Sequence, residues 1–104
     1  LGHSSPSRWT FSGLLNAAQV AGGLFANPTR PSVVWSLGCY GSTISQPVNN
    51  SLAHAFLLRP QGGAAAVLGA SALTTVSSDV AWMNTMLLYL PQARIGDALW
   101  QSQQ

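Results

Sequence analysis

The sequence contains no lysine and no glutamate, and only 6% of its 104 residues are charged. A soluble globular domain carries about a quarter charged residues, so this chain has little polar surface for a free-standing unit. Because 47% of the residues are hydrophobic, we expect much of the surface to be covered by further chain or by a partner. The composition therefore indicates one part of a larger fold.

Positive charge is also sparse. Four arginines stand far apart in the sequence, at Arg8, Arg30, Arg59 and Arg94. Phosphate recognition needs clustered positive charge, and this spacing supplies none. The sequence therefore predicts no nucleic-acid partner.

Cysteine is nearly absent, since Cys39 is the single one and only two histidines accompany it. This set excludes an internal disulfide and predicts no metal site and no cofactor. The most apolar stretches, residues 62–76 and 80–90, are shorter than the roughly 20 residues of a membrane-spanning helix. No membrane span is predicted, and Cys39 is either a small core residue or a reactive one.

Two short apolar runs predict buried strands. Residues 32–37 are rich in β-branched and aromatic side chains and lie between Pro31 and Gly38, and residues 64–69 form the second run. We expect Cys39 to lie where the first strand ends.

A helical pattern follows each of these strands. The first helix is expected after a cap at Asn50 or Ser51, and the second after a cap at Ser77 or Ser78. Outside these elements we expect a loop over residues 1–10, a short helix within residues 11–24 and a last helix over residues 94–104.

Strand, helix, strand and helix with short connections predict an α/β unit, in which helices cover both faces of a parallel sheet. Ligands of such sheets bind beyond the carboxyl ends of the strands. Cys39 and the loop over residues 70–78 occupy that edge. A strand ahead of Leu1 would bring His3 to the same edge.

Five motifs carry a family resemblance. Residues 1–6 read Leu-Gly-His-Ser-Ser-Pro and residues 33–41 read Val-Val-Trp-Ser-Leu-Gly-Cys-Tyr-Gly. They resemble the paired His and Cys motifs of the gingipain-type (C25) cysteine peptidases, which belong to the caspase-like superfamily. Residues 51–58, 62–71 and 95–99 are similar to the helix after the nucleophile, the following strand and the closing helix of that family. The resemblance covers nearly the whole chain in family order.

The resemblance implies a caspase-like three-layer α/β fold with a mainly parallel sheet. Residues 1–104 would form the carboxy-terminal part of that peptidase domain, as a βαβα unit with a terminal helix. The amino-terminal half of the domain would then lie before Leu1 and would be the partner that completes the sheet. Analogy with exported gingipain-like proteins implies a secreted or cell-envelope protein of bacteria.

The resemblance also implies an activity, that of a cysteine endopeptidase acting on a peptide or protein substrate. Cys39 would be the nucleophile and His3 its proton-transfer partner, while the backbone N–H groups of Ser4 and Cys39 would bind the oxyanion. The substrate side chain would contact Trp9, Leu73, Thr74 and Thr75. The loop over residues 70–78 contains no acidic residue ahead of Asp79, so cleavage after Arg or Lys is not specifically expected.

Two other functions fit the same residues. A non-catalytic scaffold or interaction domain could keep His3 and Cys39 on the same fold, with a thiol that alkylates slowly. An unrelated α/β binding module could use the turn from Gly38 to Gly41 to bind a small anion at a helix amino terminus. Without the family motifs, Cys39 alone would be taken for a buried core residue.

Overall fold

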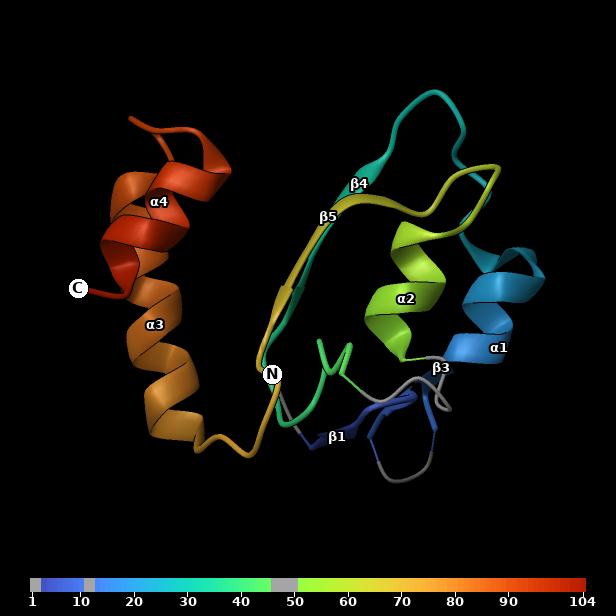
Figure 1. Ribbon diagram of the computed structural model, residues 1–104, viewed down its shortest axis with the longest axis horizontal. Coiled ribbons are helices and arrows are strands. Elements are labelled where there is room, and N and C mark those ends of the chain that lie inside the picture. The colour runs from blue at the N-terminus through green and yellow to red at the C-terminus, as the bar shows by residue number, and fades with distance from the viewer. Residues whose placement is uncertain (1–2, 11–12, 46–50) are drawn as a thin grey trace. The chain divides into compact units, whose positions relative to one another are not determined.

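The computed structural model describes residues 3–10, 13–45 and 51–104 and divides into two units, Leu1–Thr74 and Thr75–Gln104. Each unit is described by itself. The elements of the first unit are β1 (Ser4–Ser5), β2 (Arg8–Trp9), β3 (Leu15–Asn16), α1 (Ala17–Gln19), η1 (Val20–Leu24), β4 (Ser32–Ser36), α2 (Leu52–Leu57) and β5 (Ala64–Gly69) (Figure 1).

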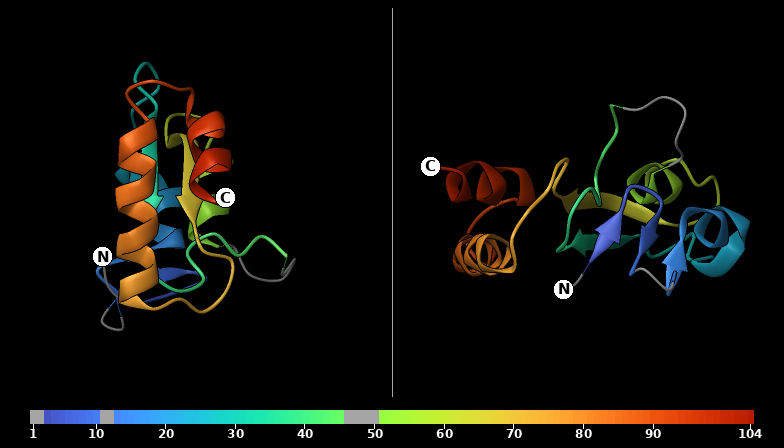
Figure 2. Two further views of the ribbon diagram at one scale, coloured as in Figure 1. Left: turned by 90° about the vertical axis from the view of Figure 1, so that its left-hand side faces the viewer. Right: turned by 90° about the horizontal axis from the view of Figure 1, so that it is seen from below.

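The two predicted strands are present as β4 and β5, and they pair in parallel. Val34 lies opposite Val67 and Ser36 opposite Gly69, and the two arrows point the same way in Figure 2. Parallel neighbours need a crossover connection, which α2 supplies here. The prediction of an α/β unit is confirmed.

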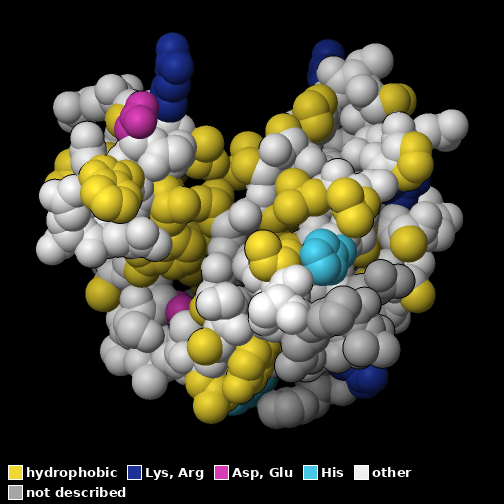
Figure 3. Space-filling model, in the orientation of Figure 1, with side chains coloured by type: hydrophobic (Ala, Val, Ile, Leu, Met, Phe, Trp, Pro, Cys, Tyr) yellow, Lys and Arg dark blue, Asp and Glu magenta, His cyan; other side chains and the backbone are white. Residues whose placement is uncertain are grey.

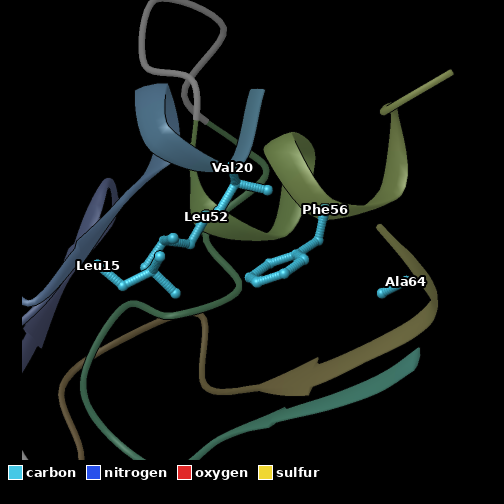
Figure 4. Close-up of a cluster of buried hydrophobic side chains, with 5 residues drawn as sticks. All are labelled: Leu15, Val20, Leu52, Phe56 and Ala64. Atoms are coloured by element: carbon cyan, nitrogen blue, oxygen red, sulfur yellow. The ribbon is translucent and has the colours of Figure 1, made fainter. Parts of the chain in front are cut away.

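Helix α2 covers one face of this sheet. Ser51 caps the helix, because its side chain accepts a hydrogen bond from the His54 N–H at 3.2 Å. Asn50, the other cap candidate, lies outside the described residues. The buried cluster under the helix consists of Leu15, Val20, Leu52, Phe56 and Ala64 (Figure 4). Val34 and Val67 reach it from the sheet, so α2 is held to β4 and β5 by apolar packing.

The expected loop over residues 1–10 is wrong at two places, Ser4–Ser5 and Arg8–Trp9, which form strands, and residues 1 and 2 lie outside the described part of the chain. Ser4 pairs with Trp9 and Ser5 with Arg8 in an antiparallel hairpin, and β3 extends it to a sheet of order β1-β2-β3. Pro6 and Ser7 form the turn, as their residue types favour. Strands of two residues are too short to show the period-two alternation from which strands are predicted.

The expected short helix within residues 11–24 is found only in its second half. Asn16 and Gln19 form a capping box at the start of α1, and their side chains each bond the other's backbone N–H. Gly23, with a φ of 123°, ends the regular geometry inside η1. Residues 11 and 12 lie outside the described part of the chain.

The second unit consists of two helices, α3 (Val76–Tyr89) and α4 (Ile95–Ser102), in contact with each other. The indole N–H of Trp82 donates to the Ser102 hydroxyl at 3.1 Å and joins them. Both helices were predicted, and in the part of the chain that the structure describes no helix is long and apolar enough to cross a membrane.

The predicted caps of α3, Ser77 and Ser78, are wrong. Thr75 caps the helix, because its hydroxyl accepts the Ser78 N–H at 3.2 Å. The Ser78 hydroxyl in turn accepts the Thr75 N–H at 3.1 Å. Ser78 is therefore the third residue of the helix in a reciprocal cap, a role that the pattern of small polar residues did not distinguish from the cap itself.

Candidate active site

Cys39 lies just beyond the carboxyl end of β4, as predicted. Tyr40, the next residue, has a φ of 58°, and this left-handed conformation turns the chain back. The Tyr40 N–H then donates to the Ala72 carbonyl and the Ser42 N–H to the Ala70 carbonyl, both at 3.0 Å. The loops that follow β4 and β5 are thus bonded to each other.

The loop after Cys39 packs tightly on the end of β4. A Cβ atom added to Gly41 would lie 2.3 Å from the Ser36 hydroxyl, so no larger residue fits without displacing that side chain. A Cβ atom on Gly69 would lie 2.6 Å from the Ser42 hydroxyl. These two close approaches fix the backbone on which Cys39 is presented.

The sulfur of Cys39 contacts the loop after β5. The Thr74 N–H donates to Sγ at 3.5 Å, the thiol donates to the Thr74 carbonyl at 3.5 Å, and the Thr74 hydroxyl donates to Sγ at 3.9 Å. Cys39 is partly exposed, so its side chain is not a buried core residue. Of the predicted substrate-contact residues, Thr74 is the one that the structure places against this sulfur.

The histidine segment lies beside the cysteine loop. The Ser4 hydroxyl donates a hydrogen bond to the Cys39 carbonyl oxygen, which joins residues 35 positions apart in the sequence. His3 is exposed, and its carbonyl accepts the Thr10 N–H at 2.8 Å. The two motifs therefore meet at Ser4, next to His3.

The direction of the Ser4 amide follows from the hairpin. Since the Thr10 N–H donates to the His3 carbonyl, Ser4 and Trp9 form a pair without hydrogen bonds between them. The N–H of such a residue points away from the paired strand, and β1 lies at the end of its sheet. The ladder with β2 therefore does not use the Ser4 N–H.

Trp9 is held against the sheet end. Its indole N–H donates to the Ser36 hydroxyl at 2.8 Å, and Ser36 is buried at the last position of β4. The turn of the same hairpin is tied to α2, because the Leu52 N–H donates to the Pro6 carbonyl at 2.7 Å. Ser36 was not predicted as part of the site. Its one signal is a hydroxyl at the end of an apolar strand.

The remaining predicted substrate contacts, Leu73 and Thr75, lie in different surroundings. The Leu73 side chain is 73% exposed, next to the residue that contacts the Cys39 sulfur. Thr75 belongs to the second unit, where its hydroxyl caps α3. The structure therefore brings Ser4, Cys39 and Thr74 together, places Trp9 at the adjoining strand end, and uses the Thr75 hydroxyl for a helix cap.

No group of three His, Cys, Asp or Glu side chains that could hold a metal ion occurs among the described residues.

One of three comparisons with known proteins gives a match. The chain matches the family model described as peptidase family C25 over residues 1–104. No curated protein and no solved structure matches it. The mixed α/β fold, with β4 and β5 in parallel, is compatible with a partial caspase-like domain, and the family implies cysteine peptidase activity. Because the match covers the whole of the sequence, this chain belongs to peptidase family C25, the gingipain family.

Proposed function

We propose that the chain carries the catalytic dyad of a cysteine endopeptidase, with Cys39 as the nucleophile and His3 as its partner. The observation that carries the proposal is the hydrogen bond from the Ser4 hydroxyl to the Cys39 carbonyl. It ties the backbone next to the imidazole to the backbone that presents the thiol. A thiol and an imidazole on neighbouring loops are the minimum set for covalent acyl transfer.

The reaction proceeds in two halves. The Cys39 thiolate attacks the carbonyl carbon of the scissile peptide, and the tetrahedral intermediate collapses to a thioester as the amine leaves with a proton from His3. Imidazole then removes a proton from water, whose oxygen attacks the thioester. The acid product leaves, and the proton returns to the sulfur.

Backbone amides serve as the oxyanion donors. The Ser4 N–H, which the hairpin ladder does not use, and the N–H of Cys39 would bind the developing negative charge. Ser4 lies in a β-strand, a backbone conformation that any residue adopts, so its side chain adds no strain there.

The loop after β5 contributes at the sulfur and at the substrate. The Thr74 N–H, 3.5 Å from Sγ, would stabilise the thiolate because a hydrogen bond to a charged group is strong. The exposed Leu73 side chain would contact an apolar substrate group, and the Trp9 ring would border it from the hairpin.

The proposal is tested in the full-length protein with Cys39→Ala and His3→Ala, measured on fluorogenic peptides. We expect each variant to lower kcat/KM by at least about a thousandfold. The matched control is His54→Ala, because His54 lies on α2, and it should retain activity. Full activity in Cys39→Ala, or equal losses in all three variants, would contradict the dyad.

An inactive scaffold on the same fold is the alternative. The observation that favours it is the contact of the thiol with the Thr74 carbonyl at 3.5 Å, in which Cys39 is a hydrogen-bond donor. Alkylation by iodoacetamide near neutral pH separates the two. A thiol activated by His3 reacts quickly, and this rate falls in His3→Ala, whereas a scaffold thiol reacts slowly in both proteins.

A further inference from the structure

A cavity of about 290 Å³ lies at the hairpin of β1 and β2, which follows His3 in the sequence. Its lining consists of Ser4, Ser5, Ser7, Arg8 and Thr10. Ser4 bonds the Cys39 carbonyl, and the backbone of Thr10 bonds that of His3. Two residues of the lining are therefore bonded to the segments that contain His3 and Cys39.

Arg8 is the one charged residue of this lining, and its charge is unopposed. No hydrogen bond or ion pair engages its guanidinium within the described ranges 3–10, 13–45 and 51–104. The sequence has no Asp or Glu from residue 1 to residue 74, so the first unit contains three arginines and no carboxylate side chain. An anion for Arg8 has to come from outside this unit.

The hairpin register places hydroxyl donors beside that cation. Ser5 lies directly opposite Arg8 in the antiparallel pair, so both side chains project from the same face. Ser7 precedes Arg8 at the end of the turn. The hydroxyls of Ser5 and Ser7, like the guanidinium, have no partner in the part of the chain that the structure describes. A planar guanidinium with hydroxyls at its side is suited to a carboxylate.

The space continues beyond Arg8. A second cavity of about 430 Å³ shares Ser7 and Arg8 with the first and extends to Asn16 and Ala18. Arg8 thus stands between two adjoining hollows along the hairpin. We call these two hollows the groove, and Arg8 is the one charged residue of its lining. In the view of Figure 3 charged side chains are sparse among apolar and neutral ones, so a single cation has a large share in any charge selectivity.

We propose that this groove binds a carboxylate of the peptide substrate, with the Arg8 guanidinium and the Ser5 and Ser7 hydroxyls as donors. The protein then favours substrates that place a negative charge in this groove. This inference rests on the proposed peptidase activity. The carboxylate belongs either to an Asp or Glu side chain or to the substrate's free carboxyl terminus.

Binding to the full-length Cys39→Ala protein tests the site without turnover. Three fluorescent peptides are compared by titration: a Glu peptide with an amidated terminus, the same peptide with Gln, and the Gln peptide with a free carboxyl terminus. We expect one of the two carboxylate peptides to bind about fivefold more tightly than the uncharged one, since ion pairs at exposed sites are weak. The tighter peptide identifies the source of the carboxylate.

Substitutions of Arg8 test whether the tighter binding of the carboxylate peptide depends on its guanidinium. Arg8→Gln should abolish this gain and Arg8→Lys should retain part of it. The matched control is Arg30→Gln, which removes the same charge from an exposed residue outside the groove, and it should retain the full gain. Equal binding of all three peptides, an unchanged gain in Arg8→Gln, or an equal loss in Arg30→Gln would overturn the carboxylate site.

Peptide hydrolysis by the protein with Cys39 intact distinguishes failure of the groove proposal from failure of the peptidase proposal. If peptides are hydrolysed with the same kcat/KM for Glu and Gln, and binding shows no Arg8-dependent gain, the groove proposal fails and the peptidase proposal stands. If Arg8-dependent binding is present but no peptide is hydrolysed, the dyad fails and the groove stands as a peptide-binding site.

Discussion

The hydroxyl of Ser4 donates a hydrogen bond to the carbonyl oxygen of Cys39, so the residue after His3 is joined directly to the proposed nucleophile. Neither partner lies in the apolar core. The bond therefore acts on the position of the two loops more than on the stability of the fold.

Removal of this bond should affect catalysis more than folding. In Ser4→Ala we expect unfolding to be easier by about 1 kcal/mol, because a carbonyl oxygen loses one partner, and kcat/KM to fall by about tenfold. Urea denaturation and peptide hydrolysis measure the two effects. Ser45→Ala, which removes an exposed hydroxyl, should change neither quantity. An unchanged kcat/KM in Ser4→Ala would show that the bond does not position the dyad.

Gly41 should tolerate no side chain. The Cβ atom of Gly41→Ala would enter the space of the Ser36 hydroxyl, which accepts the Trp9 indole N–H. We expect a loss of about 2 kcal/mol in stability and a shift of tryptophan fluorescence as that bond breaks. Gly22→Ala is the control, because no atom lies within 4 Å of its added Cβ. Equal stability of the two variants would show that Ser36 can move aside without cost.

The left-handed backbone conformation at Tyr40 predicts that a polar substitution there is more stable than an apolar one. Asn adopts this conformation readily, whereas a β-branched residue does not. Tyr40→Val should therefore be less stable than Tyr40→Asn by about 1 kcal/mol, although Val is the more apolar residue. Thermal unfolding of both variants measures the difference. The opposite order would mean that packing of the side chain outweighs the backbone conformation.

The core under α2 should be sensitive to truncation. Leu52 is 2% exposed in the cluster with Phe56 and Val20, so Leu52→Ala should cost about 2–5 kcal/mol by leaving a cavity. Leu58, at the end of the same helix, is 75% exposed, and Leu58→Ala should cost less than about 0.5 kcal/mol. Denaturant midpoints compare the two. Similar costs would place α2 elsewhere than on this sheet.

The central elements could be predicted from the sequence because their signals are local. The run from Ser32 to Ser36 is bounded by Pro31 and a later glycine, and Ser51 stands where a cap belongs, so strand and helix are visible in short windows. The hairpin of β1 and β2 could not be predicted in this way. It depends on pairing with Leu15 and on the bond from Trp9 to Ser36, contacts that form only after the chain has folded back.

In the candidate site, too, local features could be predicted from the sequence and contacts between distant residues could not. Cys39 could be placed at a strand end from the sequence pattern, and the family motif named His3 as its partner. The contacts of Cys39 with Ser4 and Thr74 each span 35 residues, and no local pattern encodes them. The charge of Arg8 was visible from the start. The hydroxyls around it form a cavity only through the hairpin register.

Two backbone hydrogen bonds, from Tyr40 to Ala72 and from Ser42 to Ala70, couple the loops after β4 and β5, so a displacement of one loop moves the other. A substrate that pushes on Leu73 would therefore also move the backbone that holds the sulfur of Cys39. Sequence changes that alter substrate preference in the second loop would then be coupled to the rate of the chemical step. With Cys39 as the proposed nucleophile, selection for a new substrate would act on the alignment of its sulfur as well as on the loop after β5.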